Sequence, residues 1–122
     1  MKSFYIALAL LALLAVAIAL NYLYINNVSN RLLEITSTIS HATNDEIGRH
    51  IYEIYSYWSE EKNKISMSVG YVTLDKIDDT ISSLQVAYLN DEKYEFEHYL
   101  AILENSAREL ARLEHFSVFN IL

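Results

Sequence analysis

The apolar and polar residues of this chain follow two different patterns. Between Lys2 and Arg31 no charged residue occurs, and the stretch Phe4–Ile25 is almost continuously apolar. A helix rises about 1.5 Å per residue, so about twenty residues cross a hydrocarbon core about 30 Å thick. The stretch is therefore predicted to be a membrane-spanning helix that contacts lipid through residues 4–25.

The residues at the two ends of this span predict its orientation. Lys2 and the amino terminus place positive charge before the span, whereas Arg31 after it is balanced by Glu34. The positive-inside rule then keeps the N-terminus in the cytoplasm and the C-terminal part outside. Tyr22 and Tyr24 are predicted to lie at the outer membrane interface, where amphipathic rings gather. We expect a cell-membrane protein with an anchor at residues 1–26 and an extracytoplasmic domain at residues 27–122.

A cleaved signal peptide is the alternative interpretation of the same stretch. Ala15-Val16-Ala17 and Ala17-Ile18-Ala19 both fit the small-x-small pattern of a cleavage site. The apolar run continues through Leu20, Leu23 and Ile25, beyond the usual length of a signal core, which favours an uncleaved anchor. With either fate, the remainder of the chain is placed outside the cytoplasmic membrane.

Beyond the span, apolar residues recur mostly in steps of three and four, the spacing of one helix face. Breaks are predicted at Thr43-Asn44-Asp45, where an Asn or Asp side chain caps the next helix, at Ser68-Val69-Gly70-Tyr71 and at Asn90-Asp91. Thr73 is the predicted cap of the helix after the second break. The fold is therefore predicted to be all-α, with the membrane helix followed by a small antiparallel bundle of three to four helices. The stripes consist of Val28, Leu32, Ile35, Ile39 and Ala42; Ile47, Ile51, Ile54, Trp58, Ile65 and Val69; Leu74, Ile77, Ile81, Leu84 and Tyr88; and Phe96, Leu100, Leu103, Ala107, Leu110 and Leu113.

Composition narrows the function classes. The 122 residues carry a net charge of −7, and all 16 acidic residues lie after the span. This charge argues against nucleic acid as a partner and against docking onto anionic lipid. The chain has no Cys, no Pro and only two Gly, so the domain is held by packing alone and offers few turn residues for sheets.

Three segments resemble a known family. They are Trp58-Ser59-Glu60-Glu61-Lys62-Asn63-Lys64 in mid-chain, Leu74-Asp75-Lys76-Ile77, and the closing Phe116-Ser117-Val118-Phe119-Asn120-Ile121-Leu122. Together with the N-terminal anchor, they make the chain similar to the small bacterial membrane proteins catalogued as domain of unknown function 4363. Tyr71 and Thr73 stand where that family is expected to have His and Glu. The resemblance implies an anchored helical protein and no particular activity.

An aromatic cluster is the strongest candidate site. Tyr52, Tyr55, Tyr57 and Trp58 lie within seven residues, and large amphipathic aromatic residues are enriched at protein interfaces. The alternative is that Trp58 and one or two of the Tyr fill the core of the bundle. The sequence leaves both interpretations open.

Metal and catalytic chemistry have little basis in the sequence. Glu95-x-x-His98 has the spacing of di-iron bundles but occurs once, and Glu46, His50 and Glu53 share one helix face. We therefore predict no metal, no other cofactor and no catalytic residue. The nucleophile elbow and the phosphate-cradling Gly-rich loop are both missing from the sequence.

These observations predict a non-enzymatic single-pass membrane protein whose outer bundle binds another protein or itself, in an accessory or scaffold role. No small-molecule substrate and no nucleic acid are expected. One alternative is a small extracytoplasmic bundle that senses a ligand. Another is a secreted helical protein left after signal-peptide cleavage.

Overall fold

The computed structural model consists of four α-helices. They are α1 (Lys2–His41), α2 (Asn44–Ile65), α3 (Tyr71–Leu89) and α4 (Lys93–Ile121). The structure describes the backbone of residues 1–66 and 69–121, and the side chains of residues 1–66 and 69–112. No strand occurs in these ranges, which confirms the all-α prediction of an apolar helix followed by a small bundle.

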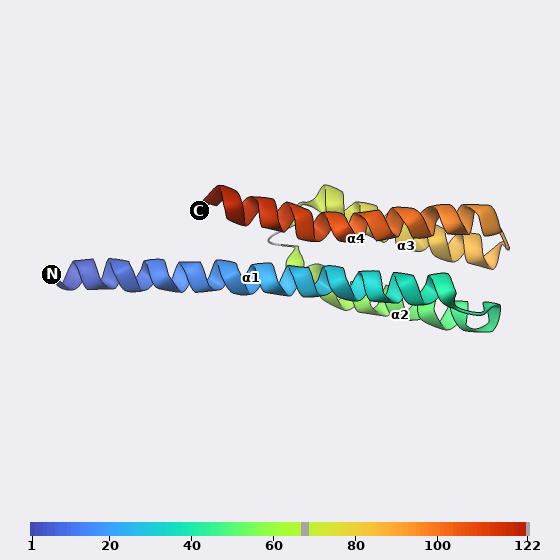
Figure 1. Cartoon of the computed structure of the whole chain (residues 1–122), viewed down its shortest axis with the longest axis horizontal. Helices are drawn as coiled ribbons and strands as arrows, with labels where there is room; N and C mark the ends of the chain where they lie inside the picture. The colour runs from blue at the N-terminus through green and yellow to red at the C-terminus, as the bar shows by residue number, and fades with distance from the viewer. Residues whose placement is uncertain (67–68, 122) are drawn as a thin grey trace.

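The first helix is one unbroken rod of 40 residues (Figure 1). Asn26 and Asn27, which form a polar collar after the apolar stretch, do not interrupt it. Neither Gly nor Pro, the two residues least favourable in a helix interior, occurs in α1. The N-terminal half of α1 projects beyond the bundle, and the C-terminal half is one of its four walls.

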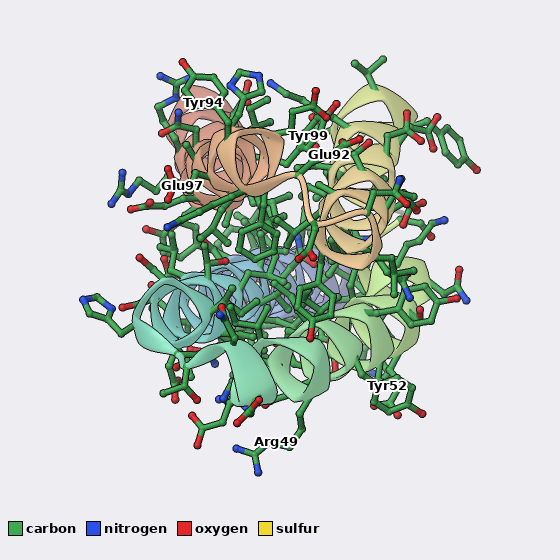
Figure 2. The ribbon with its side chains drawn as sticks, turned by 90° about the vertical axis from the view of Figure 1, so that its right-hand side faces the viewer. Arg49, Tyr52, Glu92, Tyr94, Glu97 and Tyr99 are labelled. Atoms are coloured by element: carbon green, nitrogen blue, oxygen red, sulfur yellow. The ribbon has the colours of Figure 1, made fainter. Side chains whose placement is uncertain are left out.

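The helices run alternately up and down and pack around a square. α1 packs against α2 and α4, and α3 packs against the same two helices, so α1 and α3 are diagonal neighbours. Figure 2 looks along the bundle from its distal end, the end that carries the α1–α2 and α3–α4 turns. The opposite end, which carries the α2–α3 turn and from which α1 projects, is called the proximal end.

The predicted stripes form the core. Most of their members are buried, and Ile47, Tyr88 and Phe96 pack against the core while keeping partial exposure. Ile25 differs from the prediction, which placed it at the end of the membrane span. It is 0% exposed and lies in the core of the bundle. The fully buried large side chains are Ile25, Leu32, Ile35, Ile39, Ile54, Ile65, Leu74, Ile77, Ile81, Leu84, Leu103 and Leu110.

Two of the three turns differ in detail from the sequence prediction. The break before α2 falls where it was predicted, but Asn44 and Asp45 already belong to the helix, so the predicted Asn or Asp cap is wrong. Thr43 is the N-cap residue, and its side chain makes no capping hydrogen bond. The third helix begins at Tyr71, with Gly70 as its N-cap, so the predicted cap at Thr73 is wrong. Gly70 has φ −64, an ordinary value, and therefore does not supply a left-handed helix end. Ser68 of the predicted break lies outside the described residues.

The third turn ends α3 in a Schellman motif. The Asp91 N–H donates to the Tyr88 carbonyl at 3.3 Å, and the Glu92 N–H donates to the Ala87 carbonyl at 2.9 Å. Asp91 takes the left-handed position with φ 56, which Asp tolerates better than most side chains. The predicted break at Asn90-Asp91 is thus confirmed, and these bonds satisfy carbonyls at the end of α3.

A buried hydroxyl links α1 to α4. The Ser29 hydroxyl donates to the Ala107 carbonyl at 2.5 Å, which links the two helices. Ser106, 1% exposed, has no hydrogen-bond partner for its hydroxyl among the described residues. Ser29 therefore supplies a specific contact between α1 and α4, whereas the Ser106 hydroxyl supplies none.

Candidate functional site

The predicted aromatic cluster is divided between the core and the surface. Trp58 is 2% exposed and belongs to the core, and its Nε1 donates to Oδ1 of Asp78 at 2.6 Å. Lys62 donates to the other oxygen of Asp78. This hydrogen bond, followed by the negative charge of Asp78, raises the pKa of Lys62 above its usual value. Trp58 and Lys62 thereby hold α2 to α3 through one carboxylate.

Tyr57 occupies an intermediate position between α1 and α2. Its ring packs against the core, and the Arg31 guanidinium lies 6.0 Å from the ring centre. Burial raises the pKa of Tyr57, and the nearby positive charge of Arg31 opposes the rise. Arg31 also pairs at 3.0 Å with both Glu34 and Glu53. These contacts give Tyr57 a structural role in the α1–α2 contact.

Tyr52 and Tyr55 remain on the surface of α2. Tyr52 is 71% exposed and Tyr55 is 51% exposed. Figure 2 shows Tyr52 pointing away from the bundle, on the outer side of α2. The structure therefore leaves only these two residues of the four available to a partner.

The two Tyr at the end of the apolar stretch meet the bundle. Tyr24 packs against the core and its hydroxyl donates to the Glu61 carboxylate, which is only 15% exposed. Tyr22 is half-buried. The bundle thus begins at Tyr22 and Tyr24, the residues that were predicted to lie at the outer membrane interface.

The His and Glu side chains do not converge on a metal site. Nδ1 of His50 lies 3.3 Å from Glu53, but Glu53 already pairs with Arg31. His98 stacks on the neighbouring Tyr99 with ring centres 5.6 Å apart. Within the described residues, no group of three His, Asp or Glu side chains is arranged to hold a metal ion.

A groove lies at the distal end of the described structure. Its volume is about 1170 Å³, and it lies between α1 and α4, closed at one end by the α3–α4 turn. Its apolar lining comes from all four helices: Leu33 and Ile39, Ile47, Ala87 and Leu89, and Phe96 and Leu100. Its charged rim is formed by Asp91, Glu92, Lys93, Glu97, Glu104 and Arg108.

Small side chains explain why this groove exists. Ser37 and Ser40 of α1, Ala42 just after it, and Ala101 of α4 line the groove, and their side chains are too small to fill it. Tyr88 lines the same groove, and a Cβ added at Gly48 would lie 3.2 Å from the Tyr88 hydroxyl. This groove was not predicted from the sequence. The sequence feature that could have indicated it is the run of small Ser and Ala residues beside the buried stripe of α1 at the distal end.

The turns around the groove are strongly acidic. Residues 44–49 and 90–97 contain two basic residues, Arg49 and Lys93, and the acidic residues Asp45, Glu46, Asp91, Glu92, Glu95 and Glu97. A hydrogen bond to Glu95, followed by the negative charge of Glu95, raises the pKa of Glu92. Glu92 and Glu95 therefore lie close together at this tip.

Two exposed apolar side chains lie beside this acidic rim. Leu89, which also lines the groove, is 71% exposed, and Tyr94 is 87% exposed. In Figure 2, Tyr94 and Glu97 lie on α4, and Glu92 lies at the α3–α4 turn. Apolar surface with a charged rim is typical of protein-binding sites. The distal groove is thus a second candidate surface, separate from Tyr52 and Tyr55.

In comparisons with protein-family models, curated proteins and solved structures, no match to this chain was found.

Proposed function

We propose that this protein is a non-enzymatic, single-pass membrane protein that holds a helical bundle outside the cell membrane and binds another protein at the distal groove. The observation that carries this proposal is the continuity of α1. One helix is long and apolar enough to cross a membrane in its first half, and forms a wall of the bundle in its second. A bundle held this way presents its distal end away from the membrane.

The exposure of the first half supports the anchor. Its most apolar window is 0% buried, and large side chains on every side of the helix, such as Leu10, Leu11 and Leu13, are more than half exposed. A helix that is apolar all round needs an apolar environment. The bundle offers none at this level on most sides of α1, and lipid supplies it. The orientation with the N-terminus in the cytoplasm rests on the charge distribution around the span.

The chemistry of the groove indicates the kind of partner. An open groove lined by Leu, Ile, Phe and Ala suits the apolar face of an amphipathic helix. The net negative rim favours basic residues on the flanks of that helix and disfavours a second copy of the same tip. We therefore propose a partner of a different sequence that presents a basic amphipathic helix.

Two further functions remain as alternatives. The groove also supports a ligand-sensing bundle, although at about 1170 Å³ and open to solvent it is wider than most small-molecule pockets. A secreted bundle is supported by the position of the core, which begins at Ile25. Cleavage after Ala17 or Ala19 would leave every core residue in place.

Site-specific photo-cross-linking in membranes tests the proposal. A photoreactive residue replaces Ser37 or Ala101 in the groove of the full chain, and Tyr52 or Tyr55 in matched variants on α2. All four positions are exposed, so the substitutions spare the core. We expect one recurrent protein attached at positions 37 and 101, with the yield falling at high salt because the rim is charged.

The other outcomes of this experiment contradict the groove in different ways. Cross-links at positions 52 and 55 alone would move the site to the exposed Tyr of α2. Links between identical chains would replace the partner with self-association. Stabilisation of the bundle by a small metabolite, with no cross-link at any position, would favour the ligand-sensing alternative.

A further inference from the structure

The proximal end of the bundle also exposes apolar side chains. Tyr71 and Val72, the first two residues of α3, are 76% and 85% exposed. They follow the α2–α3 turn, at the end of the bundle from which the apolar half of α1 emerges (Figure 1). Although α3 lies diagonally across the bundle from α1, these exposed side chains lie at the same end of the bundle as the apolar half of α1.

The last helix extends beyond this end. The backbone of α4 is helical to Ile121 and runs past the α2–α3 turn, alongside the apolar half of α1 (Figure 1). The nine residues 113–121 span about 13 Å at 1.5 Å per residue. From His115 to Leu122 the sequence has no Lys, Arg, Asp or Glu, and it includes Phe116, Val118, Phe119, Ile121 and Leu122.

The position of α4 beside α1 matters for the membrane. If the first half of α1 crosses the hydrocarbon core, the end of α4, which extends past the bundle beside α1, enters the outer leaflet. We propose that the proximal end of the bundle is seated in the outer leaflet of the membrane that α1 spans. The end of α4 reaches the upper acyl chains, and Tyr71 and Val72 lie at the level of the headgroups. This inference rests on the proposed anchor.

The distribution of charge agrees with such a seat. At the proximal end Lys62, Lys64 and Lys76 pair with Asp78, Glu61 and Glu109, whereas residues 44–49 and 90–97 at the distal turns carry six acidic residues against two basic ones. Acidic side chains in excess of basic ones therefore gather at the end farthest from the lipid phosphates. A depth of about 5–10 Å is typical of protein segments that lie in the interface, and the length of the α4 extension is sufficient for it.

Fluorescence quenching by lipids tests the seat in the full chain. Because the sequence has no Cys, single-Cys variants at Leu11, Val72, Val118, Phe119 and Tyr94 carry one environment-sensitive label each in phosphatidylcholine vesicles. Spin labels placed either near the headgroups or deep in the acyl chains act as quenchers. The emission of Trp58, the single Trp, checks that each variant is folded.

The expected pattern separates the seat from the anchor. A label at position 11 should lose most of its emission to the deep quencher, and labels at 72, 118 and 119 to the shallow one. A label at position 94, on the distal tip, should keep its emission with both. Quenching at 11 without quenching at 72, 118 or 119 would overturn the seat and leave the anchor intact. No quenching at 11 would overturn both.

Discussion

The two halves of α1 have the same secondary structure and opposite relations to their surroundings. Up to Leu23, large apolar side chains are exposed on all sides of the helix. From Ile25 to Ile39, the buried apolar residues fall on one face in steps of three and four. The comparison shows that one continuous helical backbone carries two patterns of side chains: apolar residues all round the first half and on one face of the second.

The junction between the halves determines how they are coupled. Because α1 is unbroken, the direction of the anchor is also the direction of the first bundle helix. Tyr24 and Glu61 tie the junction to α2, and Ser29 ties α1 to α4 a few residues further along. We therefore expect the bundle to stand on the membrane as one body with its anchor, without a flexible linker.

The largest expected difference between the halves is in core packing. Leu32→Ala should lower the free energy of unfolding by about 2–5 kcal/mol, because Leu32 is 0% exposed and its loss leaves a cavity. Leu11→Ala, the same change in the other half, should alter it by less than about 0.5 kcal/mol. Chemical unfolding in detergent, followed by Trp58 emission, measures both. Equal losses would show that residue 11 packs against protein.

The next largest effect is on membrane insertion, which should depend on the first half of α1 and not on the second. Leu11→Arg should make membrane insertion less favourable by about 3–4 kcal/mol, because it places a charge near the centre of the span. The matched change Asn30→Arg, at an exposed position of the second half, should leave insertion unchanged. Separation of membrane and soluble fractions measures the difference. Full membrane recovery of Leu11→Arg would contradict the proposed span.

A smaller effect is expected at the seam between α1 and α4. Ser29→Ala should lower the free energy of unfolding by about 1 kcal/mol, because it removes the hydrogen bond to Ala107. Ser106→Ala should have no effect or raise it, because that hydroxyl is buried without a partner among the described residues. Parallel unfolding curves test the pair. A loss of stability in Ser106→Ala would reveal an unrecognised partner of that hydroxyl.

An effect of similar size is expected at the junction between the two halves. Tyr24→Phe should lower the free energy of unfolding by about 0.5–1.5 kcal/mol, because the Glu61 carboxylate loses a donor while largely buried. Tyr5→Phe, at an exposed position of the first half, serves as the control and should have no effect. If the two variants are equally stable, Tyr24 does not tie the anchor to the bundle.

Much of the fold could be predicted from the sequence because the stripes are so regular. Residues such as Leu32, Ile54 and Leu84 recur at helical spacing without Pro to interrupt them, so helix type and core face follow directly. The boundary between anchor and bundle could not be placed the same way. Ile25 is apolar in either environment, and only its contacts with other helices assign it to the core.

The candidate site was predicted less well, because it depends on the directions of side chains around a helix and on the space between helices. The sequence grouped Tyr52, Tyr55, Tyr57 and Trp58 by proximity along the chain, but on a helix these positions face different directions. The groove lies between α1 and α4 at the distal end, where the small side chains of Ser37 and Ala101 line it. Such a hollow is a property of two helices far apart in sequence, so no single stripe predicts it.

Thiol accessibility in intact bacterial cells tests the central claim, that α1 spans the membrane and holds the bundle outside. Two single-Cys variants suffice, Ser3→Cys before the apolar half and Asn44→Cys at the distal turn, each treated with a membrane-impermeant thiol reagent. The claim predicts labelling of the full-length chain at position 44 in intact cells, and at position 3 only after the cells are opened. Labelling at position 3 alone, or recovery of a shortened chain in the medium without its first residues, would contradict it.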